Sequence, residues 1–176
     1  IDLLMLVHPR ELPDETLYAI DQFLLRGGRL LVFVDPDAEA DASGVDPRDP
    51  LSGAEPRPSD LARLFAGWGI QFDPTRVVLD EKYALQVQPD PNGPPVRHLA
   101  VLGLGAEALN QGYVVSGDLG RLHFSTAGAR GLGKDSTLQM EPLAQTSAAS
   151  ALVEARAGRD AVADPDRLRE DFRAGG

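Results

Sequence analysis

Residues 1–36 carry the clearest fold signal in the chain and read IDLLMLVHPRELPDETLYAIDQFLLRGGRLLVFVDP. The apolar run that ends at His8-Pro9 predicts a strand buried on both faces. Pro13 and the two acids after it are typical of a helix start, and Gly27-Gly28 favours a left-handed stop. A second apolar run, over 29–34, predicts a second buried strand. The stretch as a whole therefore predicts a βαβ unit with a right-handed crossover.

The rest of the chain alternates between apolar segments and two Pro-rich stretches, 35–58 and 86–97, which we interpret as long exposed loops. Ser59 is a good N-cap for a second helix, which glycines at 67 and 69 end. Short apolar runs predict further strands at 76–80, 98–102, 112–115, 122–125 and 142–147, and Asp164-Pro165-Asp166 predicts the start of a charged helix. This order favours an α/β fold with three layers and a mainly parallel sheet.

Length and charge narrow the class of protein. The chain has 176 residues, with 17 Lys and Arg against 27 Asp and Glu, a net charge of −10, and it has no Cys. We interpret residues 1–176 as a single domain. The negative charge argues against nucleic-acid binding, and the missing Cys excludes thiol catalysis. No apolar stretch is long enough to span a membrane. Because Ile1 already lies inside an apolar run, we expect a domain cut from a longer protein.

Carboxylates at or just after the ends of predicted strands are the candidate ligand or interaction residues, namely Asp35, Asp37 and Asp80. Ligands of α/β proteins bind at the carboxyl ends of parallel strands, although Asp35-Pro36 could simply turn the chain. The alternating acids from Asp35 to Asp41 are spaced as in a calcium loop. Such a loop needs Gly at its sixth position, where Ala40 stands, so the pattern favours a solvated acidic loop. Cation binding by residues 35–46 stays open.

Other motifs in the chain fail on their details. Residues 128–134 fit the G-x-x-x-x-G-K part of a phosphate-binding loop, but Asp135 stands where a hydroxyl is needed and no helical stripe follows, which favours a surface loop. His8, His98 and His123 have no metal-ligand spacing. Ser125 lacks the frame of a nucleophile elbow. We therefore predict no catalytic, cofactor-binding or metal-binding residue.

Residues 19–36, AIDQFLLRGGRLLVFVDP, resemble the signature segment of the GldG-like family of ABC-transport auxiliary proteins, first associated with gliding motility. The preceding DLLMLVHP at 2–9 is similar to the lead-in strand of that family. Further similarities follow in order along most of the chain, at Leu64-Phe65, Trp68-Gly69-Ile70, residues 77–80, residues 124–128, Pro142-Leu143 and Thr146-Ser147.

The resemblance implies a flavodoxin-like or class I glutamine-amidotransferase-like fold on the extracytoplasmic, periplasmic side of the inner membrane. It implies partners in an ABC-2-type permease and its ATPase, with the exported substrate or a cell-surface glycan as a further candidate. The membrane anchors would lie outside this chain. Because the chain has no Cys, amidotransferase activity is not implied, and no cofactor is expected.

Three hypotheses follow. The first is a non-enzymatic auxiliary domain that recruits or positions protein partners. The second is a sugar- or nucleotide-active enzyme that uses strand-end carboxylates such as Asp35 and Asp80. A weaker third hypothesis is ATP binding through Gly133 and Lys134. The transported substrate, the oligomeric state and a separate lobe in the second half stay open.

Overall fold

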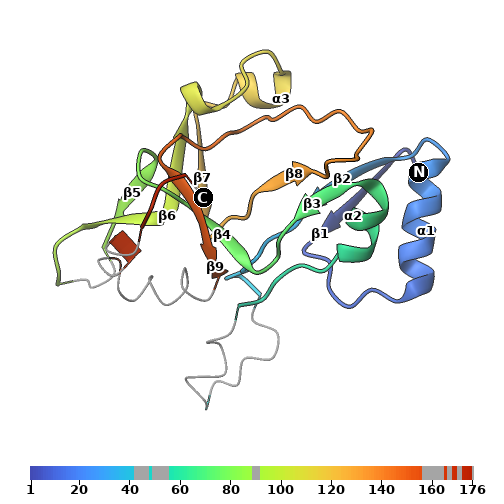
Figure 1. The fold of residues 1–176 in the computed structure, drawn as a ribbon, viewed down its shortest axis with the longest axis horizontal. Helices are drawn as coiled ribbons and strands as arrows, with labels where there is room; N and C mark the ends of the chain where they lie inside the picture. Colours follow the sequence, from blue (N-terminus) through green and yellow to red (C-terminus); the bar gives the residue numbers. More distant parts are fainter. Residues whose placement is uncertain are drawn as a thin grey trace. The chain divides into compact units, whose positions relative to one another are not determined.

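The structure, a computed structural model, describes residues 1–41, 48, 56–88, 92–155, 165, 168–169 and 172–175. The chain is divided into two compact units (Figure 1). Unit 1 comprises Ile1–Pro74 and Gly128–Gln139, and unit 2 comprises Thr75–Ala127 and Met140–Gly176. Among the described residues, each unit has hydrophobic clusters of its own, one in unit 1 and two in unit 2.

Unit 1 begins with the predicted βαβ segment. Strand β1 (Leu3–Val7), helix α1 (Asp14–Leu25) and strand β2 (Arg29–Phe33) follow in order, and the two strands pair in parallel from Leu3↔Arg29 to Val7↔Phe33. Gly27 follows α1 with φ +89°, so the predicted left-handed stop is confirmed. The N–H groups of Gly27 and Gly28 close the helix on the carbonyls of Leu24 and Phe23, at 2.9 and 3.0 Å.

The two faces of the β1–β2 pair differ in burial. Even-numbered side chains pack into a cluster with apolar residues of α1 and of the second helix. Odd-numbered apolar side chains of both strands are exposed instead. The prediction that these strands are buried on both faces was therefore wrong for one face.

Unit 1 continues with helix α2 (Ala62–Trp68) and strand β3 (Ile70–Phe72), which pairs antiparallel with β8 (Arg130–Leu132). Gly69 ends α2 at φ +71°, as predicted, whereas Gly67, the other predicted stop, lies inside the helix. Ser59 is not the N-cap, because α2 begins after Leu61 and the Ser59 hydroxyl bonds elsewhere. Residues 128–134, predicted to form a surface loop, contain strand β8. In this strand, Arg130 lies over the rings of Phe65 and Phe72.

Unit 2 holds β4 (Arg76–Asp80), which pairs antiparallel with β9 (Ser150–Glu154), and a sheet in the order β5-β6-β7. The strands of that sheet are β5 (Ala84–Val87), β6 (Val96–Gly105) and β7 (Arg121–Ser125), all antiparallel. A short helix, η1 (Ala106–Ala108), follows β6. The strand expected at 112–115 is replaced by helix α3 (Val114–Gly117), and the one expected at 142–147 has a single bridge, Leu109↔Ala144. The helix expected after Asp164 falls largely outside the described residues.

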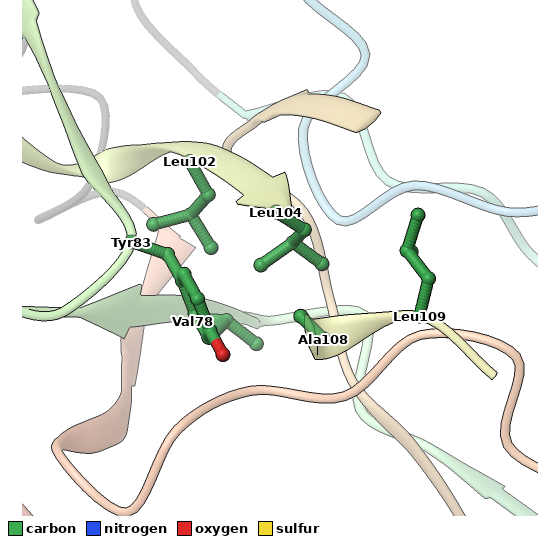
Figure 2. Packing of buried hydrophobic residues seen from close by; sticks show 6 residues of the cluster. All are labelled: Val78, Tyr83, Leu102, Leu104, Ala108 and Leu109. Carbon is green, nitrogen blue, oxygen red and sulfur yellow. The ribbon is translucent and has the colours of Figure 1, made fainter. Parts of the chain in front are cut away.

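The prediction of a three-layer, mainly parallel sheet of flavodoxin-like or glutamine-amidotransferase-like type was wrong. Of the pairs in the described residues, only β1–β2 is parallel, and the other sheets are small and antiparallel. Strand β4 shows why the pattern misled. Val78 packs into one cluster with Tyr83, Leu102 and Leu104 (Figure 2), and Leu79 packs into the second cluster of unit 2. An antiparallel strand between two clusters has the same continuous apolar run as a parallel one.

Candidate functional site

The parallel pairing of β1 and β2 brings the residues that follow both strands to one edge. The N–H of His8, directly after β1, donates to the carbonyl of Phe33 at the end of β2, at 2.9 Å. His8 has φ +44°, a left-handed conformation that is uncommon for a residue other than glycine. Asp35 lies two residues beyond β2. We call the polar groups gathered at this edge the strand-end cluster, formed by His8, Arg10, Asp35, Asp37, Asp41, Arg57 and Ser59.

His8 links two segments that are distant in sequence. Its Nδ1 lies 2.9 Å from Oγ of Ser59, and its Nε2 lies 3.3 Å from Oδ2 of Asp41. The carboxylate of Asp41 only accepts, so Nε2 donates to it; when the ring carries a single proton, Nδ1 accepts from the serine hydroxyl. Oγ of Ser59 in turn accepts the N–H of Asp35 at 2.9 Å. The result is a directed chain of hydrogen bonds from the backbone after β2 to the Asp41 carboxylate.

The acidic segment after β2 is held by hydrogen bonds from backbone N–H groups and from one arginine side chain. The N–H of Asp37 donates to Oδ1 of Asp35 at 2.9 Å, and the N–H of Arg57 donates to Oδ1 of Asp37 at 3.2 Å. Arg10 donates to Oδ2 of Asp41 at 2.6 Å. Asp37 is 1 % exposed. The beginning of the stretch expected to be an exposed, solvated loop is thus buried, while residues 42–47 and 49–55 lie outside the described residues.

The electrostatics of the cluster single out Asp35. Burial raises the pKa of its carboxyl group, and the nearby charge of Asp37 raises it further, against the lowering effect of the Asp37 N–H and of His8. A carboxyl group with a raised pKa at a strand end is a group that can hold a proton.

The order hydroxyl, imidazole, carboxylate in Ser59, His8 and Asp41 is the donor order of a serine hydrolase triad. A nucleophile must reach its substrate, however, and Ser59 is 2 % exposed with its oxygen occupied by the Asp35 N–H. The chain of hydrogen bonds therefore fastens the segment that leads into α2, and the acidic segment, to the strand ends. In the part of the chain that the structure describes, no three His, Asp or Glu side chains are grouped to hold a metal ion.

Asp80 belongs to unit 2 and does not join Asp35 and Asp37 in the strand-end cluster of unit 1. It is fully buried, and its carboxylate accepts hydrogen bonds from two segments. The donors are N–H and Oγ–H of Ser147 at 2.6 and 2.8 Å, and the N–H groups of Lys82 and Tyr83 at 2.9 and 3.2 Å. This carboxylate fastens the turn after β4 to the segment that leads into β9.

Sequence reasoning placed Asp35 and Asp37 at a strand end and included Asp41 in the acidic series, but it missed the bonds of His8 and Ser59 to this segment. The sequence pattern presents His8 only as a possible metal ligand and Ser59 only as a helix cap. The available signal was the position of His8 directly after a predicted strand, at the same sheet edge as Asp35.

The molecule defined by these features is an acidic, mixed α and β domain with mainly antiparallel sheets and a strand-end polar cluster bonded within the chain. The family model described as "ABC-type uncharacterized transport system" matches residues 1–176, so the chain belongs to this family of ABC transport auxiliary components. Searches of curated proteins and of solved structures gave no significant match. No helix within the described ranges is long and apolar enough to cross a bilayer.

Proposed function

We propose that the chain is a non-enzymatic, GldG-like auxiliary domain that recruits or positions partners of an ABC-type transport system. The partners are an ABC-2-type permease and its ATPase, and the domain works on the extracytoplasmic, periplasmic side of the inner membrane. The observation that carries the proposal is the match of the transport family over the whole chain. The sequence similarity of residues 2–9 and 19–36 supports the finer assignment to the GldG-like group.

The polar chemistry of the strand ends supports binding over catalysis. Asp37 and Asp80 are buried and bonded to backbone N–H groups, and Ser59 is closed off from solvent. Groups already satisfied by the chain offer a substrate little to bind. Recognition of a protein partner, an exported substrate or a cell-surface glycan would then use the surface rather than a pocket.

Co-purification of the full-length protein from membranes in mild detergent tests this function. We expect permease and ATPase subunits to be recovered with the intact protein and to be lost, or much reduced, when residues 1–176 are deleted. A deletion protein that still recovers both subunits in full would show that another part of the protein recruits them. Recovery of neither subunit with the intact protein would contradict the proposal.

The extracytoplasmic location can be tested separately, because the chain contains no Cys. Val114 is 88 % exposed, whereas Leu79 is fully buried. We expect a membrane-impermeant maleimide to label Val114→Cys in cells whose outer membrane has been permeabilised and whose inner membrane is intact. Leu79→Cys, whose thiol would be buried, and the unsubstituted protein are the controls and should not be labelled. Labelling of Val114→Cys only after the inner membrane is broken would place the domain in the cytoplasm.

One observation favours the alternative of a carboxylate-based sugar- or nucleotide-active enzyme, namely the raised pKa of Asp35 beside His8. A thermal-shift screen against sugars, nucleotides and divalent cations separates the two functions. A ligand at 100 times its dissociation constant stabilises by about 2.7 kcal/mol, which raises Tm by roughly 5–10 °C in a chain of this size. A shift that disappears in Asp35→Ala would favour the enzyme, and a screen without shifts would favour the auxiliary domain.

A further inference from the structure

The exposed side of the β1–β2 pair is an apolar surface that the described residues leave uncovered. It consists of Leu3, Met5 and Val7 from β1 and Leu31 and Phe33 from β2, which we call the open face. These five side chains are 43–62 % exposed. Parallel strands are usually covered on both sides, and in this unit α1 and α2 supply apolar residues only to the cluster on the opposite side. A contiguous exposed apolar patch of this kind is typical of an interaction surface.

The open face has a direction, because both strands run the same way. Arg29 stands opposite Leu3 in the register, at the end where both strands begin. No carboxylate among the described residues forms an ion pair with Arg29. At the end where the strands finish, Asp35 and Glu39 follow β2. The face therefore carries Arg29 at one end, where Asp2 precedes β1, whereas at the other end Asp35, Glu39 and Asp41 outnumber Arg10 and the charge is net negative.

Two copies of the open face have complementary charges when one copy is rotated so that its strands run opposite to those of the other. In a two-fold arrangement with the strands of the two copies antiparallel, Arg29 of each copy approaches the acidic end of the other. Opposite charges meet at both ends while the apolar side chains meet in the middle. Two faces in the same orientation would instead bring Arg29 against Arg29.

The area of the open face agrees with a pairing of this kind. Five half-exposed apolar side chains present on the order of 500 Å² to solvent. Two such faces bury about 1,000 Å² in total, which is about the lower limit for a biological interface between proteins. The side chains that flank the face, Arg29 among them, add to this area.

We propose that the open face binds a second copy of this chain, forming a two-fold dimer in which the β1–β2 pairs stack face to face. Met5 occupies the middle of β1 and lies close to the axis of the dimer. The proposal does not depend on the transport function, since it follows from the burial, register and charge of unit 1.

The first test is sedimentation velocity of the 176-residue chain over a range of concentrations. We expect a dimer, and we expect Met5→Glu to weaken it at least 10-fold because a carboxylate would be buried near the axis. Tyr18→Glu on α1, where the side chain is 67 % exposed, is the matched control and should leave the dimer unchanged. Circular dichroism checks that both variants are folded. A chain that is monomeric at every concentration, or a dimer insensitive to Met5→Glu, would overturn the proposal.

The second test uses the absence of Cys in the chain. Met5→Cys should form a disulfide-linked dimer under mild oxidation, because residues near a two-fold axis face their own copies, whereas Tyr18→Cys should not. Arg29→Glu should weaken the dimer several-fold at low salt, with Arg121→Glu in unit 2 as the control. If Met5→Cys fails to crosslink but is protected from maleimide in the full-length complex, another protein segment covers the face and the second copy is the wrong occupant.

Discussion

At the scale of single residues, two buried or half-buried polar groups hold together segments that are far apart in sequence. The imidazole of His8 joins Ser59 and Asp41, and the carboxylate of Asp80 collects N–H and O–H donors from Ser147 and from the turn after β4. In both cases the residue lies at the end of a strand, and its partners are backbone groups or short side chains. Substitutions at these positions therefore report on loop attachment rather than on core packing.

Replacing Asp80 should be strongly destabilising. In Asp80→Ala the N–H groups of Lys82, Tyr83 and Ser147 lose their acceptor in a buried site, and we expect a loss of about 3 kcal/mol in the free energy of unfolding. Glu81 is the neighbouring acid and is exposed, so Glu81→Ala should change stability by less than about 0.5 kcal/mol. Urea denaturation compares the two. Equal stability of both variants would mean that the hydrogen bonds of Asp80 are dispensable.

Asp35→Asn should stabilise the protein at neutral pH. Burial raises the pKa of Asp35 above its ordinary value of 3.8, so the folded chain binds this proton more tightly than the unfolded chain. Stability is then lost as pH rises through the window between the two pKa values. Asparagine keeps an oxygen for the Asp37 N–H without the charge. We expect Tm to rise by about 1–2 °C at pH 7, and the gain to vanish below about pH 3.8.

Asp35→Ala is the matched comparison for this effect. Alanine also removes the charge, but it leaves the Asp37 N–H without its acceptor, so Tm should fall rather than rise. If Asp35→Asn lowers Tm at pH 7, the ionised carboxylate is itself stabilising, and folding lowers the pKa of Asp35 instead of raising it.

At the scale of elements, helix ends and strand partners are set by different kinds of information. A helix end depends on the few residues around it. Gly27 and Gly69 take up left-handed conformations directly after α1 and α2, and both stops could be located from the sequence. A strand's partner depends on segments that can lie far away in the chain.

Gly27 offers a test of the local part of this argument. Its φ of +89° suits glycine, and a Cβ there would meet no atom within 4 Å, so strain and not crowding decides the outcome. We expect Gly27→Val to lose more than about 1 kcal/mol of stability, while Gly27→Asn is better tolerated. Gly67→Ala inside α2 also has open space but no left-handed backbone, and should be neutral or stabilising by up to about 1 kcal/mol. Thermal unfolding of the three variants measures these differences, and a neutral Gly27→Val would refute the argument.

The difference between local and distant information explains what could be predicted from the sequence. The elements of residues 1–34 were predicted because caps, glycine stops and apolar runs lie within them. Strand β9 was missed, and a mainly parallel sheet was predicted where most pairings are antiparallel, because an apolar run does not encode its partner. Val114 and Val115 favoured a strand by their β-branching, yet both are exposed and lie in α3. In the strand-end cluster, Ser59 is 51 residues from His8, beyond any local pattern.

At the scale of the whole molecule, the chain builds two units with separate hydrophobic clusters. In the described part of the chain, unit 1 has one cluster that includes Leu64 and Phe65, whereas unit 2 has two clusters on either side of β4. Loss of packing in one unit should therefore be felt first within that unit.

Leu79→Ala and Phe65→Ala form a matched pair that tests this separation. Each removes a buried side chain and should lose about 2–5 kcal/mol of stability. Under native conditions we expect hydrogen exchange to accelerate in β4, β6 and β9 in Leu79→Ala, and in β1, β2 and α2 in Phe65→Ala. Exchange that accelerates equally in both units in either variant would show that the two units unfold as one.

The pairing of β3 with β8 also bears on the order in which the protein can fold during its synthesis. Strand β3 ends at Phe72 and its partner begins at Arg130, so about 60 residues must leave the ribosome before this pair can form. At ordinary rates of translation this is an interval of several seconds. During that interval the βαβ segment and α2 are complete while the edge of β3 is bare. A nascent chain that stalls after Pro74 has left the ribosome, and before Arg130 has done so, is accordingly the species most exposed to chaperones and to aggregation through that edge.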